Sequence, residues 1–312
     1  MGWEAGRSLS ISARLGSTLA LLLVISACEG PTGPEGPAGP TGAQGNPGNP
    51  GGTGPAGPPG APFAGRTIYG VDGANMLISF GALTPDRSIA KVAITGLSAG
   101  ETVVGIDFRP LNNTLFAVGS SSRLYTLNVG TGVATAVVAT PFTPGLSGTS
   151  FGVDFNPMVD RLRIHTDTEQ NLRINQITGA VAFNDAPLAY NAGDPNAAAN
   201  PNVVGTAYTN SLNPAPTVTQ LYGIDSNLDI LVELDFPNDG RLDTIGRLNF
   251  DTTGDVGFDI AGDTDIAYAS LTPAAAATGS SRLYTINQRT GNATLVGVIG
   301  HATPLRGIAV AP

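Results

Sequence analysis

Five short segments that start with glycine recur through most of the chain. They read GIDF, GVDF, GTAY, GFDI and GIAV and begin at residues 105, 152, 205, 257 and 307, so that successive glycines are 47, 53, 52 and 50 residues apart. We call them the marker segments. A period of about forty to fifty residues that holds four short β-strands is typical of a β-propeller, in which each repeat forms one blade. The repeat therefore predicts an all-β fold.

A second repeated pattern supports this fold. The segments SSRLYTLN (121–128) and SSRLYTIN (280–287) are nearly identical, NLRIN (171–175) is a shorter copy, and each is followed by Thr-Gly. A glycine a few residues after a strand suits the left-handed position of a hairpin turn. The segment 235–240 faintly resembles a calcium loop, but its Asn-Asp-Gly lies between two β-rich runs and is predicted to form a hairpin turn.

The two ends of the repeat predict how the ring closes. The last marker segment, 307–310, has two residues after it, so its unit lacks three strands. Three β-rich runs, 67–71, 76–80 and 90–94, precede the first marker segment. Residues 63–312 are therefore predicted to form a single five-bladed β-propeller. Its closing blade combines one C-terminal strand with three N-terminal strands, which removes free edges from the ring.

Residues 1–27 have the features of a lipoprotein signal peptide. Two arginines precede the apolar run 19–25, and Ile25-Ser26-Ala27-Cys28 resembles the lipobox of bacterial lipoproteins, in which the cysteine is lipidated. Cys28 is the only cysteine of the chain. We expect Cys28 to anchor the protein to a membrane of the cell envelope, at the outer membrane or the cell surface. The alternative is an ordinary secretory signal with an unmodified cysteine.

Residues 30–62 resemble collagen, and together with Cys28 and Glu29 they make up a predicted stalk, 28–62. Glycine occupies every third position through eleven triplets. Three polyproline-II chains can wind around one another only if the residue at the crowded axis lacks a side chain. The pattern therefore predicts a triple-helical stalk that joins three copies of the chain. The alternative is a disordered or semi-rigid spacer of a single chain.

Composition excludes several classes of function. The chain has 24 acidic and 15 basic residues and a net charge of −9, which argues against binding to nucleic acid. One cysteine and two histidines are too few for a cysteine-based or three-histidine zinc site. We therefore expect no cofactor, with calcium as the one ion that the acidic residues of the repeat suit.

The segments VGIDFRP (104–110), FGVDFNP (151–157), DRLRIHT (160–166) and NLRINQITG (171–179) resemble a bacterial family known as domain of unknown function 4394. The resemblance covers most of 63–312. It implies a secreted, propeller-like domain and no particular reaction. The GTAY and GIAV segments depart from the family pattern because they lack its aspartate.

Three marker segments carry an aspartate at the same position, namely Asp107, Asp154 and Asp259. If the marker strand is the innermost one, the three carboxylates lie around a common axis, where they suit a hard cation such as calcium. The alternative is structural: each aspartate accepts hydrogen bonds from a neighbouring loop or blade. Alanines occupy the equivalent positions of the other two segments, Ala207 and Ala309, which favours the structural role.

Arg161, Arg163 and His165 alternate along a β-run and share one face of it, so that they offer a polar face to an acidic or sugar ligand. The alternative is a solvated strand edge. The sequence contains no HExxH and no phosphate-binding loop. We therefore expect a surface-exposed, non-enzymatic lipoprotein whose propeller binds or scaffolds an unknown extracellular ligand. The alternative is a hydrolase that cuts polysaccharide with the axial carboxylates.

Overall fold

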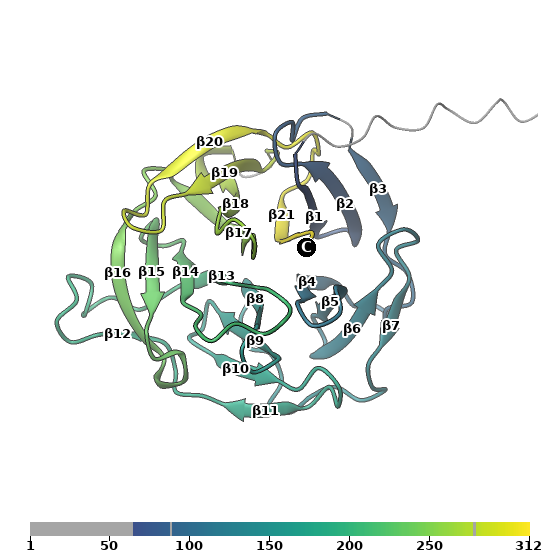
Figure 1. Ribbon diagram of the computed structural model, residues 1–312, viewed down its shortest axis with the longest axis horizontal. Coiled ribbons are helices and arrows are strands. Elements are labelled where there is room, and N and C mark those ends of the chain that lie inside the picture. The colour runs from purple at the N-terminus through teal and green to yellow at the C-terminus, as the bar shows by residue number, and fades with distance from the viewer. Residues whose placement is uncertain (1–64, 88, 277–278) are drawn as a thin grey trace, which may run out of the picture. The chain divides into compact units, whose positions relative to one another are not determined.

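A computed structural model describes residues 65–312 with the exception of 88, 277 and 278. The predictions for the signal peptide, Cys28 and the stalk lie outside these described residues. Within them, five separate sheets lie around a central axis as the blades of a ring (Figure 1). The prediction of an all-β, five-bladed propeller is confirmed. No helix in the described part of the chain is long and apolar enough to cross a bilayer.

The strands of each blade follow one another from the axis outward. In this order the closing blade contains β21 (Leu305–Val310), β1 (Thr67–Asp72), β2 (Met76–Gly81) and β3 (Ala90–Ala93). The first blade contains β4 (Val103–Arg109), β5 (Thr114–Gly119), β6 (Arg123–Leu127) and β7 (Ala134–Ala136). The second blade contains β8 (Phe151–Asn156), β9 (Arg161–Thr166), β10 (Asn171–Ile174) and β11 (Val181–Asn184).

The last two blades follow the same plan. The third blade contains β13 (Val203–Tyr208), β14 (Leu221–Asp225), β15 (Ile230–Leu234), β16 (Arg241–Arg247) and, at its outer edge, β12 (Ala189–Tyr190). The fourth blade contains β17 (Thr252–Ile260), β18 (Ala267–Pro273), β19 (Arg282–Ile286) and β20 (Ala293–Val298). Two short 3₁₀ helices, Pro237–Asp239 and Ala274–Ala276, complete the regular structure of the described residues.

The ring closes as the sequence predicts. Strand β21 pairs antiparallel with β1, and Ile68 lies opposite Val310 while Gly70 lies opposite Ile308. The closing blade therefore takes one strand from the C-terminal end and three from the N-terminal side of the domain. This pairing leaves no unpaired sheet edge where the two ends of the repeat meet.

The marker segments lie on the five innermost strands, β4, β8, β13, β17 and β21. Their glycines allow these strands to approach one another closely around the axis. A Cβ atom on Gly257 would lie 2.5 Å from the backbone nitrogen of Ile308, and one on Gly307 would lie 3.3 Å from the Cα atom of Gly105. The recurring glycine is therefore a packing requirement of the ring.

Apolar side chains fill the space between neighbouring blades. Between the first and second blades, for example, Phe116 and Phe155 meet edge to face with their ring centroids 5.2 Å apart. Strand alternation places one face of each sheet against the next blade, so that every blade is buried on both sides. The interface between the second and third blades differs because it also contains the buried, charged side chain of Arg163.

Two details of the third blade extend the sequence prediction. The segment 235–240 does join two antiparallel strands, β15 and β16, through a short 3₁₀ helix that ends at Gly240 in the left-handed conformation. The two-residue strand β12 has no counterpart in the sequence prediction, and it pairs in parallel with the outer strand β16. It is too short to leave a β pattern in the sequence, and a parallel partner leaves no hairpin signal.

Candidate functional site

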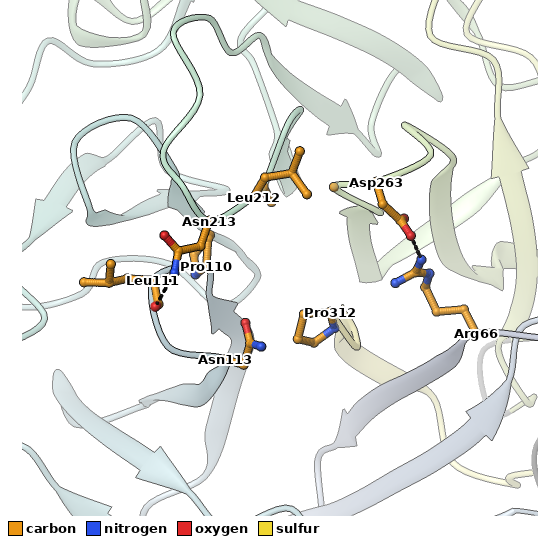
Figure 2. Close-up of a pocket in the computed structure, with 10 residues that line it drawn as sticks. Arg66, Pro110, Leu111, Asn113, Leu212, Asn213, Asp263 and Pro312 are labelled. Atoms are coloured by element: carbon orange, nitrogen blue, oxygen red, sulfur yellow. Dashed lines mark hydrogen bonds and ion pairs between the residues drawn. The ribbon is translucent and has the colours of Figure 1, made fainter.

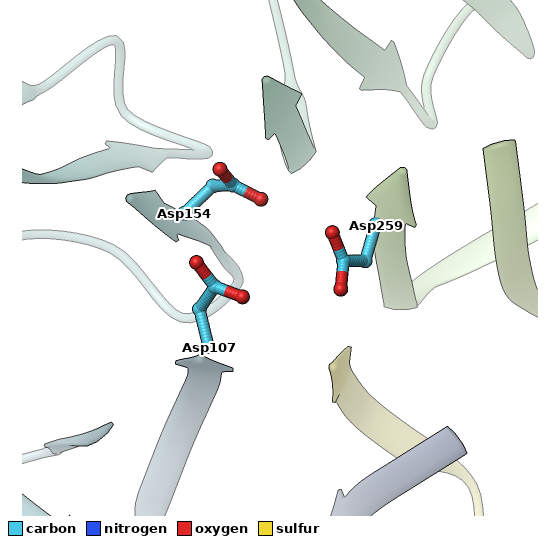
Figure 3. A group of neighbouring side chains, drawn as sticks. All are labelled: Asp107, Asp154 and Asp259. Atoms are coloured by element: carbon cyan, nitrogen blue, oxygen red, sulfur yellow. The ribbon is translucent and has the colours of Figure 1, made fainter. Parts of the chain in front are cut away.

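Asp107, Asp154 and Asp259 lie on the innermost strands β4, β8 and β17, and their side chains converge at the axis (Figure 3). Each contributes one carboxylate oxygen to a group of three that lie within 4.8 Å of one another. The three residues are 6%, 1% and 5% exposed. We call them the axial aspartates. The shared position in the marker segments thus becomes a shared position in space.

Each axial aspartate accepts a hydrogen bond from the backbone of the following blade. In each case, the position in the following blade that is equivalent to the aspartate comes one residue before the donor. The pairs are Asp107 with Phe155 at 2.7 Å, Asp154 with Tyr208 at 3.3 Å, and Asp259 with Val310 at 2.6 Å. These bonds join the first blade to the second, the second to the third, and the fourth to the closing blade.

Strands β4 and β17 each follow a blade that has alanine in place of the marker aspartate. On these two strands the N–H group instead donates to the aspartate of the same strand. The N–H of Phe108 donates to Asp107 at 2.7 Å, and the N–H of Ile260 donates to Asp259 at 2.6 Å. Three aspartates therefore satisfy five equivalent N–H groups, one on each innermost strand. We call this closed set the aspartate belt. The aspartate belt explains why alanine is tolerated at two of the five marker positions, since none of the five N–H groups lacks a partner.

Burial raises the pKa of all three axial carboxyl groups. For Asp107 and Asp154 the pKa lies well above its ordinary value, and the charges of neighbouring axial aspartates raise it further. For Asp259 burial raises the pKa to about 7, although the N–H groups of Val310 and Ile260 oppose this by stabilising the charged form. Burial is thus the main reason why the three carboxyl groups hold their protons more tightly than exposed aspartates do.

The axial aspartates are better suited to joining the blades than to enclosing a calcium ion. Calcium takes about six to eight oxygen ligands. Within the described residues, both oxygens of Asp107, both of Asp259 and one of Asp154 already accept backbone N–H groups. Three convergent carboxylates alone supply too few ligands.

Little space remains along the axis for a substrate. A cavity that borders Asp107 and Asp259 has a volume of about 30 Å³, and another, bordered by the five marker glycines, has about 10 Å³. Cavities of this size hold one or two water molecules. A sugar ring is several times larger, so that the axial carboxylates are not open to a polysaccharide in this structure.

A larger pocket, of about 270 Å³, opens at the end of the ring where the innermost strands turn back to the second strands (Figure 2). Segments from four of the five blades line it. They contribute Arg66, Pro110, Leu111, Asn113, Ser211, Leu212, Asn213, Gly262, Asp263 and Pro312. We call it the end pocket. Five of these residues also border the smaller cavity beside Asp107 and Asp259, so that the two spaces adjoin.

Side-chain bonds hold the segments of the end pocket together. Arg66 forms an ion pair with Asp263 and donates to the carbonyl of Ala311 at 2.8 Å. Asn213 donates through Nδ2 to the carbonyl of Leu111 at 3.0 Å, which connects the long β13–β14 loop of the third blade with the β4–β5 turn of the first. The pocket is therefore a built feature of the closed ring.

The predicted ligand face on β9 requires a correction. Arg161, Arg163 and His165 do share one face of the strand, but Arg163 and His165 are 1% and 0% exposed. That face packs against the third blade, where Arg163 donates to the hydroxyl of Tyr208 at 2.7 Å and pairs with Asp185 at 3.2 Å. Alternation identifies a shared face, but it does not reveal that a neighbouring blade covers it.

His165 and Arg161 also lie in structural surroundings, although Nε2 of His165 is buried without a hydrogen-bond partner among the described residues. His165 shares a hydrogen bond of 2.9 Å with the hydroxyl of Thr206 through Nδ1, and burial together with the charge of Arg163 lowers its pKa well below the usual value. The ring is therefore neutral at physiological pH. Arg161, which is half-buried, donates to the carbonyl of Asp160 at 2.8 Å.

Sequence reasoning missed one further pattern, which the structure now places. Residues 96–100 read GLSAG, which matches the GxSxG pattern of serine hydrolases. The structure places Ser98 in the connection between β3 and β4 rather than between a strand and a helix, and its hydroxyl lies 3.2 Å from that of Tyr125. Tyr125 in turn donates to Glu101. Because no histidine takes part in these bonds, the pattern is not a nucleophile elbow.

The fold and the site together define a five-bladed β-propeller with a belt of buried aspartates and a pocket at one end. The chain belongs to the family described as "Domain of unknown function (DUF4394)", whose model matches residues 76–309. The family predicted from the marker segments is thereby confirmed. No protein with a curated description matches the sequence.

Two solved structures are similar in chain trace. A structural genomics protein of unknown function from Bacteroides thetaiotaomicron is 14% identical over 80% of this chain and 67% of its own, with a TM-score of 0.47. A structure of a nidogen/laminin complex contains a chain that is 10% identical over 79% of this chain and 98% of its own, with a TM-score of 0.45. Neither similarity informs on function.

Proposed function

We propose that the chain is a surface-exposed lipoprotein of the cell envelope whose propeller binds an extracellular ligand in the end pocket. The supporting observation is the pocket itself, in which polar and apolar side chains from distant segments surround about 270 Å³ at one end of a closed ring. Loops carried by a rigid scaffold are a common place for binding sites. The axis of the ring offers no comparable space.

The sequence before the propeller supports the proposed location. Lipidation of Cys28 would attach the chain to the membrane, and residues 30–62 would hold the propeller away from it. If the collagen-like stalk joins three chains, the assembly carries three end pockets. Binding to a repetitive polymer would then gain strength from multivalency without any additional contact in each pocket.

Binding is a better proposal than hydrolysis. Convergent carboxyl groups with raised pKa values favour an enzyme, and the axial aspartates have this feature. Glycoside hydrolysis, however, needs two carboxyl groups on opposite sides of the bond, about 5–10 Å apart. One oxygen of each axial carboxylate lies within 4.8 Å of the other two, and the cavity beside Asp107 and Asp259 has about 30 Å³. This space suits water molecules and is too small for a sugar ring.

A binding screen tests the proposed site. The full chain is applied to arrays of glycans and cell-wall polymers, with and without calcium, beside the variants Leu212→Arg and Leu295→Arg. Leu212 is 42% exposed and lines the end pocket, whereas Leu295 is 53% exposed and lies on the outer strand β20. We expect binding by the wild type and by Leu295→Arg, and its loss in Leu212→Arg. Equal binding by all three would place the ligand elsewhere.

A fractionation experiment tests the proposed anchor separately. We expect Cys28→Ala to release the chain from the membrane fraction, because the lipid is the proposed attachment. Unchanged partitioning would contradict lipidation.

The mass of the soluble chain, measured with and without residues 30–62, tests the stalk. A trimer only when 30–62 is present supports a triple helix, and a monomer in both cases supports a single-chain spacer.

A further inference from the structure

We infer that the end pocket selects a neutral, hydroxyl-rich ligand, and that one sugar residue of an uncharged oligosaccharide is the unit that enters it. This inference rests on the proposed function, because it names the ligand class of the same pocket. It follows from the charge, the polar groups and the size of the lining.

The charged side chains that line the end pocket neutralise each other. Arg66 and Asp263 form an ion pair across one wall, and Arg66 also donates to the carbonyl of Ala311 at 2.8 Å. The two side chains are 23% and 52% exposed, and a charged ligand would have to compete with one partner for the other. The net charge of −9 further repels acidic polymers. The pocket therefore favours a ligand without charge.

The remaining polar groups of the lining match hydroxyl groups. The carboxamides of Asn113 and Asn213 both border the pocket (Figure 2). Asn213 uses Nδ2 to bind the carbonyl of Leu111, which leaves its Oδ1 as an acceptor, and the side chain of Asn113 has no hydrogen bond to the described residues. A carboxamide both donates and accepts, and so does a hydroxyl group. The hydroxyl of Ser211 also borders the pocket; it donates to the carbonyl of Tyr208 at 3.4 Å, and its oxygen can accept a hydrogen bond.

The size and the apolar walls of the pocket fit one sugar residue. Its volume of about 270 Å³ is slightly below the range of about 300–1,000 Å³ that is usual for drug-sized ligands. Pro110, Leu111, Leu212 and Pro312 supply apolar surface between the polar groups. A sugar ring presents C–H faces to such surface while the hydroxyl groups at its rim make hydrogen bonds. A long apolar chain would instead leave the carboxamide of Asn113 and Oδ1 of Asn213 without partners.

The test measures ligand preference together with the effect of unbalancing the ion pair. Binding of the full chain to neutral oligosaccharides, to uronic-acid polymers, to glucosamine polymers and to short peptides is compared by titration. Asp263→Asn leaves the Arg66 charge unpaired, and Arg66→Gln leaves Asp263 unpaired. The matched controls are Asp239→Asn and Arg289→Gln, which change exposed residues outside the pocket lining.

We expect the wild type and both controls to bind neutral oligosaccharides at least 10-fold more tightly than either charged polymer. Asp263→Asn should strengthen uronate binding at least 10-fold, and Arg66→Gln should do the same for glucosamine polymers. Leu212→Arg should abolish all of this binding. Circular dichroism checks that each variant folds.

The possible failures are distinguishable. If a charged polymer or a peptide binds best and Leu212→Arg abolishes that binding, the pocket is a binding site but the inferred ligand class is wrong. If the ion-pair variants leave the preference unchanged, the inference from charge balance is wrong. If the wild type binds nothing, or if Leu212→Arg leaves binding intact, the proposed function fails as well.

Discussion

Asp259 accepts a hydrogen bond of 2.6 Å from the backbone N–H of Val310 and thereby joins the fourth blade to the strand that closes the ring. The same carboxylate accepts the N–H of Ile260 at 2.6 Å. One side chain thus serves two buried backbone donors on two innermost strands. Closure of the propeller therefore depends on a polar belt at the axis as well as on the pairing of β21 with β1.

Asp259→Ala is expected to lower the free energy of unfolding by about 2–4 kcal/mol, because each buried N–H group left without a partner costs about 1–3 kcal/mol. Relief of repulsion within the aspartate belt offsets part of this loss. Asp259→Asn retains one acceptor oxygen and should lose about half as much. Denaturant unfolding followed by circular dichroism measures the difference, with Asp239→Asn as the exposed control. A loss no larger than that of the control would contradict a structural role for the belt.

The raised pKa of Asp259 predicts a stability that falls as the pH rises. Burial raises this pKa from 3.8 to about 7, so that between these values the folded chain binds a proton that the unfolded chain has released. By linkage, the contribution of Asp259 to the free energy of unfolding is largest below about pH 4. It falls between about pH 4 and pH 7 and is constant above pH 7. The difference between wild type and Asp259→Asn, measured from pH 4 to pH 8, isolates the contribution. A difference that stays constant across this range would exclude the shift.

Calcium is expected to leave the melting temperature unchanged within about 1 °C. Five of the six axial oxygens already accept backbone N–H groups, and calcium needs about six to eight oxygen ligands. Melting curves in excess EDTA and in millimolar calcium check this expectation. A rise of several degrees that disappears in Asp154→Asn would instead identify the axial aspartates as a calcium site.

The five-bladed ring could be predicted from the sequence because its symmetry requires a glycine at the same position of the innermost strand in every blade. The marker glycines occur where the innermost strands approach most closely, so that their spacing reports the blade repeat directly. The strands missing after residue 310 and the surplus strands before residue 103 then determine how the ring closes. Strand β12 could not be found in this way, since two residues carry no periodicity.

The candidate site could be predicted only in part. The shared register of Asp107, Asp154 and Asp259 indicates that they meet at the axis, but it does not tell which backbone groups they bind, because those donors lie in the following blade. The end pocket left only a weak signal in the sequence. Its residues come from turns and loops of separate blades, and only the closed ring brings Arg66 and Asp263 together. The proline and asparagine residues that follow the first marker segment, at 110–113, were the one available signal.

Gly257→Ala is expected to destabilise the ring by about 1–3 kcal/mol, the usual cost of overpacking. The added Cβ would lie 2.5 Å from the backbone nitrogen of Ile308, which cannot rotate away as a side chain could. Gly193→Ala is the matched control, since no atom lies within 4 Å of its added Cβ, and it should change stability by less than about 1 kcal/mol. Thermal unfolding of the two variants measures the contrast. Equal stabilities would show that the marker glycine is not a packing requirement.

Arg163→Ala is expected to destabilise the propeller more than the substitutions at Asp259 and Gly257, by about 3–5 kcal/mol. Its guanidinium donates to Tyr208 at 2.7 Å and to Asn238 at 2.8 Å and pairs with Asp185 at 3.2 Å, all between the second and third blades. The substitution removes a positive charge that neutralises the buried carboxylate of Asp185, and it leaves a cavity beside that carboxylate. Arg161→Ala, two residues away on the same strand face, removes a half-buried side chain that donates to the adjacent carbonyl of Asp160, and it should cost less than about 1 kcal/mol. Denaturant unfolding of both variants measures the contrast. If Arg161→Ala proved equally costly, the strand face as a whole would stabilise the fold, and the buried network around Arg163 would have no special role in joining the two blades.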